Sequence, residues 1–221
     1  MKETDIGAAV VAYLESDHWD VYQEVQVYQG GPIADIVAVC GPLVMVVECK
    51  TSMSMKLMGQ AWYWRRHCNL IQIAVPHSRN GGAGRAFAES VLHERGIGKL
   101  AVHPHAKRVD NHVRPRLRRT VDTAQLRAVL APEQKASKAG SVGGGHWTPF
   151  RRTLQQLRHH VAKHPGCTLK SAFDAITHHY SSYASGRAQL IDLIKRGVIS
   201  DLRIDTVRSG PGRGTFIRLA Q

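Results

Sequence analysis

Two acidic residues and one lysine stand close together in an apolar stretch near the start of the chain. Asp35 lies in the segment GPIADIVAV, and Glu48 and Lys50 end the segment LVMVVECK. Carboxylate oxygens are the ligands that Mg²⁺ prefers, and a bound Mg²⁺ polarises a phosphoryl oxygen and lowers the pKa of a bound water. An ammonium nearby orients that water and offsets the charge that develops on the reacting phosphate. These three residue types together predict hydrolysis of a phosphodiester.

A tight turn is expected to bring the two acids together. Residues 34–39 and 43–50 are apolar runs separated by a Gly-Pro pair, a pattern typical of a β-hairpin. Asp35 in the first strand and Glu48 in the second are then neighbours in space, although twelve residues separate them in the chain.

Glu48 and Lys50 are expected to share one face of the second strand, because strand side chains alternate between faces and Cys49 then points into the core. Residues 44–47 are apolar at every position, which indicates a central strand buried on both faces. Charges at the end of such a strand are costly unless they are paired or bind a metal ion. The alternative, in which Asp35 is a turn residue and the other two are edge-strand charges, is therefore disfavoured.

The elements around these residues follow an α/β pattern. Hydrophobic periodicity and turn signals predict a helix at 3–16, strands at 21–28, 34–39 and 43–50, a helix at about 56–67 and a strand at 70–75. A helix at 85–95 and a short strand at 99–103 extend this α/β sheet. The three residues would lie at the end of the central hairpin of that sheet.

The order of these elements and the placing of the charged residues resemble the PD-(D/E)xK nuclease superfamily. Its α-β-β-β-α-β restriction-endonuclease-like core would cover about residues 3–76. Asp35 matches the first acid of the motif, Glu48 the second and Lys50 the lysine. The chain departs from the motif at Ala34, where proline often stands, although a proline occurs two residues earlier.

The resemblance implies cleavage of DNA with Mg²⁺ or Mn²⁺ as cofactor. Asp35, Glu48 and the backbone carbonyl of Cys49 would bind the metal, and Lys50 would position the attacking water. The superfamily often adds an acid from the first helix, and Glu3 is the candidate for that ligand.

Further residues are candidates for supporting roles, each with a plainer alternative. Glu3 also suits a first helical turn in any protein because it complements the helix dipole, and Glu15 lies on the same helix. Glu24, on the polar face of the first strand, is a second supporting acid. Gln60 resembles the glutamine that many of these nucleases direct towards the site, whereas an exposed helix residue would look the same.

Two segments of the first domain are candidates for DNA contact. The helix at 56–67 carries aromatic and basic residues suited to base stacking and phosphate contact, namely Trp62, Tyr63, Trp64, Arg65 and Arg66. Alternatively, the aromatic residues are core and the arginines are solvated. The basic run at 107–119, with Arg116, Arg118 and Arg119, is expected to follow the DNA backbone beside the site, or else to be a solvated linker.

A second domain is expected after residue 145. Residues 131–145 are rich in Gly, Ser, Ala and Lys, which predicts a flexible linker between a nuclease domain at 1–130 and a smaller domain at 146–221. Helices at 149–163, 169–178 and 183–196 and two strands are expected there, an order typical of a winged helix–turn–helix.

The third helix of this domain would be the recognition helix, with polar and basic residues reaching a major groove. These are Ser182, Ser185, Arg187 and Gln189, while Arg208 and Arg213 on the wing would contact phosphates or a minor groove. Winged helices also serve as protein-interaction modules, and that alternative stays open.

Charge and composition favour a polyanionic partner. The 221 residues carry 30 Lys and Arg against 17 Asp and Glu, a formal net charge of +13. Residues 1–76 hold five basic and eight acidic residues, whereas residues 132–221 hold fourteen and five. Acids kept in an otherwise basic protein suggest metal ligands beside phosphate-binding surfaces, although chance would also produce such a fluctuation.

The remaining features bound the location and the rival functions. No apolar run is long enough to span a bilayer and the scattered cysteines form no CxxC pair, so we expect a cytoplasmic protein with DNA, not a membrane, as its partner. The rivals are a DNA-binding regulator that keeps the nuclease fold without cutting, and a Holliday-junction-resolvase-like enzyme acting as a homodimer.

Overall fold

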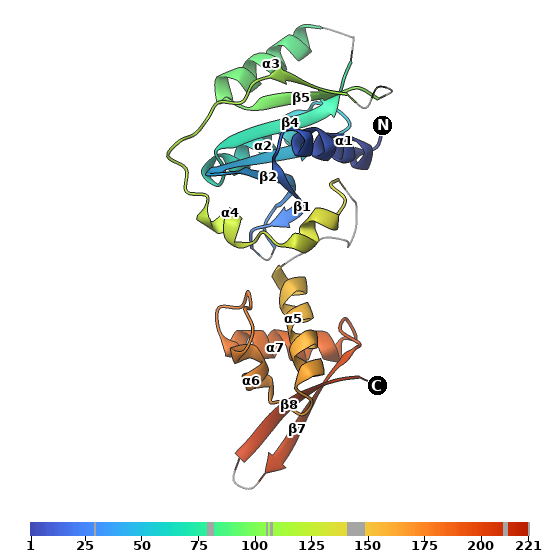
Figure 1. Ribbon diagram of the computed structural model, residues 1–221, viewed down its shortest axis with the longest axis vertical. Coiled ribbons are helices and arrows are strands. Elements are labelled where there is room, and N and C mark those ends of the chain that lie inside the picture. Colours follow the sequence, from blue (N-terminus) through green and yellow to red (C-terminus); the bar gives the residue numbers. More distant parts are fainter. Residues whose placement is uncertain are drawn as a thin grey trace. The chain divides into compact units, whose positions relative to one another are not determined.

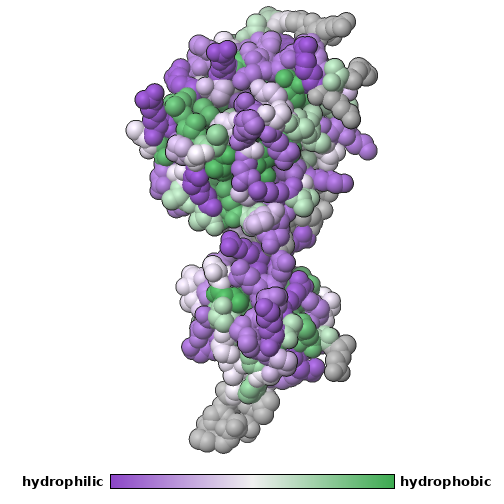
Figure 2. Space-filling model, in the orientation of Figure 1, coloured by the Kyte–Doolittle hydropathy of each residue, from purple (hydrophilic) through white to green (hydrophobic). Residues whose placement is uncertain are grey.

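A computed structural model describes residues 1–28, 30–78, 82–104, 106, 108–140, 149–209 and 212–220. The chain divides into two compact units, Met1–Trp147 and Thr148–Gln221. On the face seen in Figure 2, hydrophilic residues cover most of the surface of each unit, and apolar residues gather in smaller areas. No helix of the described residues is long and apolar enough to cross a membrane.

The first unit is a mixed six-stranded sheet with helices on both faces (Figure 1), which confirms the predicted α/β class. Its elements are α1 (Glu3–Ser16), β1 (Asp20–Gln26), β2 (Ile33–Cys40), β3 (Leu43–Cys49), α2 (Met55–Tyr63), a 3₁₀ turn (Trp64–Arg66), β4 (Leu70–Pro76), α3 (Ala83–Arg95), β5 (Gly98–Val102), β6 (Val109–Val113), α4 (Ala124–Ala128) and a second 3₁₀ turn (Pro132–Ala136). The strands follow sequence order across the sheet. β3, β4 and β5 are parallel to one another, and the other neighbours are antiparallel.

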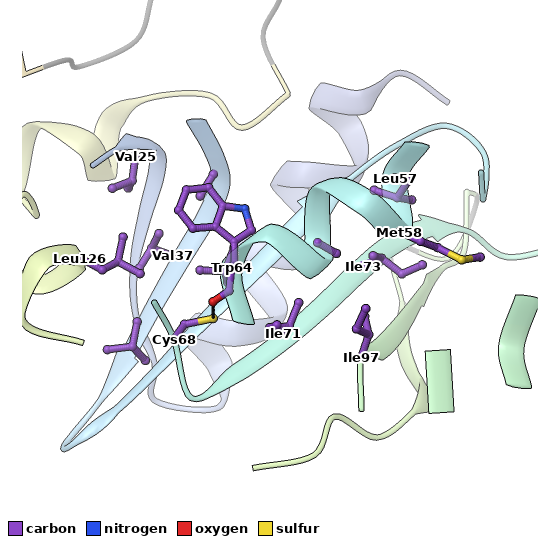
Figure 3. Packing of buried hydrophobic residues seen from close by; sticks show 14 of the residues in the cluster. Val25, Val37, Leu57, Met58, Trp64, Cys68, Ile71, Ile73, Ile97 and Leu126 are labelled. Carbon is purple, nitrogen blue, oxygen red and sulfur yellow. Dashed lines mark hydrogen bonds between the residues drawn. The ribbon is translucent and has the colours of Figure 1, made fainter. Parts of the chain in front are cut away.

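Strand β3 lies inside the sheet because its side chains are apolar on both faces. Val44 and Val46 pack in the cluster that α2 covers, whereas Met45 and Val47 pack in the cluster that α1 covers. Figure 3 shows the α2 side of this packing, with Trp64 inside the apolar cluster. The hairpin that joins β2 and β3 turns at Gly41, whose φ of +53° suits glycine.

Residues 131–140 do not form the predicted flexible linker, so this prediction is wrong for them. Gln134 is buried, and its side chain bonds to the backbone of Ala131 and Val129. The side chain of Gln23 in β1 bonds to the backbone of Lys135 and Ala139. These hydrogen bonds pack the segment onto the first unit despite its linker-like composition. Residues 141–145 lie outside the described part of the chain.

The basic run at 107–119 is also more ordered than the sequence indicated. Val109–Val113 forms the edge strand β6, which pairs with β5. Only Val109 of this strand is buried, so its apolar signal was too weak to predict a strand.

The second unit has three helices followed by a hairpin. These are α5 (Pro149–Lys163), α6 (Leu169–Asp174), α7 (Tyr183–Lys195), β7 (Leu202–Ser209) and β8 (Gly212–Leu219). Helix α6 ends at Asp174, four residues before the predicted end. The helices and the hairpin share one core, which includes Leu157, Phe173, Leu190 and Ile217.

We expect the packing of residues 131–140 on α1 to be visible in a matched pair of glycine substitutions. A Cβ at Gly7 would lie 2.8 Å from Ala139 Cβ and 2.9 Å from Ala139 O, whereas a Cβ at Gly59 in α2 meets nothing within 4 Å. Gly7→Ala should lower the free energy of unfolding by about 1–3 kcal/mol through overpacking. Gly59→Ala should raise it by up to about 1 kcal/mol through helix propensity. Urea denaturation measures both, and equal stabilisation by the two variants would contradict the packing.

Candidate active site

Asp35 and Glu48 stand opposite each other on neighbouring strands. The β2–β3 ladder pairs Ile36 with Val47, and the next step of this register places Asp35 across from Glu48. Both are buried, with 8% and 3% of their surfaces exposed. The hairpin therefore brings together the two acids that the sequence singled out.

Each carboxyl group is held by one donor from the protein. The indole Nε1 of Trp64 donates to Glu48 Oε1 at 2.6 Å, and the backbone N–H of Cys49 donates to Asp35 Oδ2 at 2.7 Å. Trp64 is itself almost fully buried in the cluster of Figure 3. Both acids are thus fixed in orientation by groups that cannot move without disturbing the core.

Burial opposes ionisation of both acids, and the charge of Asp35 adds to its effect on Glu48. Burial raises the pKa of Asp35, and the Cys49 and Lys50 contacts offset only part of that effect. Burial, followed by the charge of Asp35, raises the pKa of Glu48 to about 8 although Trp64 and Lys50 act against it. Two buried carboxyl groups on neighbouring strands favour holding a proton unless a cation lies between them.

The ammonium of Lys50 lies at the same edge of the sheet as the two carboxyl groups, but its partner comes from the opposite face. Its Nζ donates to Oε2 of Glu3 at 2.7 Å, and Glu3 is in the first turn of α1. Burial lowers the pKa of Lys50, but the bond to Glu3 and the charges of Asp35 and Glu48 outweigh burial and raise this pKa overall. Glu48 and Lys50 thus bond to elements on opposite faces of the sheet, and Lys50 stays charged.

Glu24 is a third buried acid in this region. It stands between the pairs Gln23–Ile36 and Val25–Ala34 and so lies opposite Asp35, and its charge raises the pKa of Glu48. Its φ of +56° is unfavourable for a residue with a side chain and costs on the order of 1–3 kcal/mol. Backbone strain of this kind concentrates at functional sites.

Other candidate residues have exposed side chains, unlike the buried pair. Gln60 is exposed on α2, and Glu15 is exposed in the last turn of α1. Trp64, directly after α2, contacts Glu48. From the sequence, Trp64 was expected either in the core or stacked against a base. A buried indole N–H needs an acceptor, and that need was the signal available in the sequence.

The donor set suits a hard cation with few protein ligands. Among the described residues, no group of three or more His, Cys, Asp or Glu side chains is placed to hold a metal ion. The thiol of Cys49 is no ligand, because burial raises its pKa well above the usual value and keeps it neutral. The two carboxylates and the backbone carbonyl of Cys49 would therefore be the protein's donors. Burial and the charge of Asp35, which together raise the pKa of Glu48, are the observation that fits a cation there.

Three arginines surround Trp62 on the α2 side of the sheet. The guanidinium carbons of Arg65, Arg95 and Arg118 lie 4.9, 5.5 and 5.9 Å from its ring centroid. Arg118 also donates to the backbone oxygens of Arg95 and Gly96, at the end of α3. Within the described part of the chain, no ion pair joins this arginine cluster to a carboxylate. Its remaining N–H groups suit an anionic, aromatic partner.

The other basic and polar residues named for DNA contact are more dispersed. Arg66, Arg116 and Arg119 are exposed. In the second unit, Ser182 caps α7 by accepting from the backbone N–H of Ser185, so its hydroxyl already has a structural role. Ser185 is exposed and Arg187 and Gln189 are half-buried on the same helix. The side chains of Arg208 and Arg213 lie outside the described part of the structure.

Comparisons of the chain with protein-family models, with curated proteins and with solved structures find no match. Function therefore has to be inferred from the residues and their arrangement. The buried pair of carboxyl groups is the feature of the first unit that ordinary packing explains least.

We expect Glu48→Gln to change how the stability of the metal-free protein depends on pH. The pKa of Glu48 is about 8 in the folded protein and 4.5 ordinarily, so folding takes up a proton in this interval. Stability must then fall as the pH rises from about 4.5 to 8. Glutamine does not titrate and can still accept from Trp64. In EDTA, the variant should gain about 2–4 kcal/mol over the wild type between pH 5 and pH 8.

Thermal and urea unfolding at the two pH values measure this gain. Glu15→Gln is the matched control, because it removes the same charge from an exposed position. Parallel pH profiles for the wild type, Glu48→Gln and Glu15→Gln would show that Glu48 ionises as an ordinary carboxyl group.

Proposed function

We propose that the first unit is a metal-dependent DNA nuclease of the PD-(D/E)xK type with a restriction-endonuclease-like core. The order α1-β1-β2-β3-α2-β4 is the order expected of that core. Asp35 lies on its second strand, Glu48 ends its third and Lys50 follows. The observation that carries the proposal is the buried Asp35–Glu48 pair, in which burial and the charge of Asp35 raise the pKa of Glu48, with a charged lysine beside it.

The residues have distinct roles in this proposal. Asp35, Glu48 and the Cys49 carbonyl would hold Mg²⁺ or Mn²⁺, which when bound supplies a Lewis acid and lowers the pKa of a bound water. Lys50 keeps its charge through Glu3 and orients the attacking water towards the phosphate. Trp64 and the backbone N–H of Cys49 fix the two carboxylates, so that little reorganisation is needed on binding.

DNA is proposed as the substrate because of the charge of the chain and where part of it gathers. The net charge is +13, and the arginine cluster around Trp62 contains no carboxylate partner among the described residues. The three helices and hairpin of the second unit have the order of a winged helix, with α7 as the recognition helix. A second DNA-binding unit on the same chain would raise the local concentration of DNA at the site.

One observation favours the rival function, a DNA-binding regulator that does not cut. The ion pair between Lys50 and Glu3 satisfies the lysine within the protein, without any substrate. An internal ion pair of this kind would also suit a site that only binds. Cleavage assays separate the two functions directly.

We expect cleavage of DNA with Mg²⁺ or Mn²⁺ and none with EDTA. Plasmid, linear duplex, single-stranded and branched DNA should be tested with the wild type, Lys50→Ala and Asp35→Asn. Each variant should cut at least about 100-fold more slowly, since each removes a group that acts on the reacting phosphate. Lys56→Ala, which removes an exposed lysine on α2, should cut at the wild-type rate. Unchanged DNA in every lane would favour the regulator, and mass measurement in solution would show whether the protein is a homodimer.

We expect the arginine cluster to contribute to DNA affinity through phosphates. In EDTA, Arg95→Gln should weaken binding to every DNA sequence and reduce the slope of log affinity against log salt by about one unit. Arg108→Gln is the control, because Arg108 is exposed and already paired with Asp110. Fluorescence anisotropy over a range of salt concentrations measures both slopes. Equal slopes for the two variants would show that DNA does not contact the arginine cluster.

A further inference from the structure

A pocket with both polar and apolar residues in its wall lies at the carboxyl ends of β3 and β4. Its volume is about 380 Å³. Thr51 and Ser52, which directly follow Lys50, form part of its wall. Ser78, Gly84, Arg85 and Lys99 contribute from the end of β4, the start of α3 and β5. Ligands of open α/β sheets commonly bind at the carboxyl ends of parallel strands.

The pocket and the carboxylate pair share one face of the sheet. The register pairs Glu48 with Ile73 and Ile73 with Lys99, so these three residues form one row across β3, β4 and β5. Residues that face each other in neighbouring parallel strands point to the same side. Two strand spacings separate Glu48 from Lys99, a distance of about 10 Å along the row.

The charged groups at the pocket have an excess of positive charge. Lys99 is only 1% exposed, and its ammonium pairs with Glu89. The same carboxylate accepts from Nε of Arg85 at 3.2 Å and lies 3.4 Å from Nε2 of His112. One carboxylate thus faces two permanent cations. Arg85 also donates to the backbone oxygen of Ser78 at 2.7 Å, which fixes the guanidinium at the pocket wall.

The start of α3 adds to this positive character. The helix has thirteen residues and no acid in its first turn, and among the described residues no side chain caps its N-terminus at Gly82. The partial positive charge at a helix N-terminus therefore adds to the charges of Arg85 and Lys99. The hydroxyl groups of Thr51 and Ser52 are further donors at the wall. Two basic side chains, a helix N-terminus and two residues with hydroxyl groups in or beside the pocket wall together suit a phosphate.

We propose that this pocket binds the terminal phosphate of a DNA strand, so that the enzyme recognises strand ends close to the carboxylate pair. A phosphodiester inside a strand carries a sugar on both sides, so it is hindered from approaching a side chain as buried as Lys99. A terminal phosphate carries one sugar and a larger negative charge. The inference rests on the proposed nuclease function for its substrate, but phosphate binding at the pocket does not depend on catalysis.

Binding in EDTA tests the pocket without any cleavage. Fluorescence anisotropy of the full chain with duplexes that carry 5′-phosphate, 3′-phosphate or only hydroxyl ends should show about tenfold tighter binding of one phosphorylated end. Arg85→Gln should remove that preference, and Ser52→Ala should reduce it. Arg85 is chosen over Lys99 because the ammonium of Lys99 is buried, and its loss would remove a buried partner of Glu89 and disturb the fold. Circular dichroism checks that each variant is folded.

Arg95→Gln provides the contrast, since Arg95 lies in the last turn of the same helix and outside the pocket. It should weaken binding of all the duplexes alike and keep the preference for the phosphorylated end. Equal binding of phosphorylated and hydroxyl ends by the wild type would overturn the proposal, as would a preference that survives in Arg85→Gln. Cleavage without an end preference would contradict only the proposed phosphate site. An end preference without cleavage would contradict only the proposed nuclease activity.

Discussion

The first unit is organised around two carboxyl groups that neighbouring strands hold opposite each other and away from water. Burying Asp35 and Glu48 together is unfavourable, because neither is well solvated and the charge of Asp35 disfavours ionisation of Glu48. Apolar residues at these two positions would give a more stable sheet. A divalent cation between the two carboxyl groups would stabilise their ionised forms. Binding such a cation would explain why acids occupy these two buried positions.

The surrounding structure keeps the pair in place and does not neutralise it. Trp64 holds Glu48 from the α2 face, while Glu3 on α1 keeps the ammonium of Lys50 at the same edge from the other face. Glu24, whose backbone is strained, adds a third acidic side chain close by. Side chains from both faces of the sheet thus reach the end of β3, which is where the proposed metal ion and phosphate would bind. The basic residues elsewhere on the unit suit the rest of the nucleic acid.

The sequence predicted the parts of this arrangement that depend on local pattern. Hydrophobic runs on both sides of a turn were enough to foresee the hairpin that sets Asp35 against Glu48. The bond from Trp64 to Glu48 could not be foreseen, because it depends on how a helix docks on a sheet. Gln134 was misread because its burial depends on amide hydrogen bonds that composition does not reveal, and the β6 strand because Val109 is its sole buried side chain.

Anomalous X-ray diffraction from crystals grown with Mn²⁺ tests the metal-binding role of the carboxylate pair most directly. The predicted result is an anomalous peak between Asp35 and Glu48, at about 2.0–2.6 Å from an oxygen of each and from the carbonyl oxygen of Cys49. A map without a peak between the two carboxyl groups would contradict it.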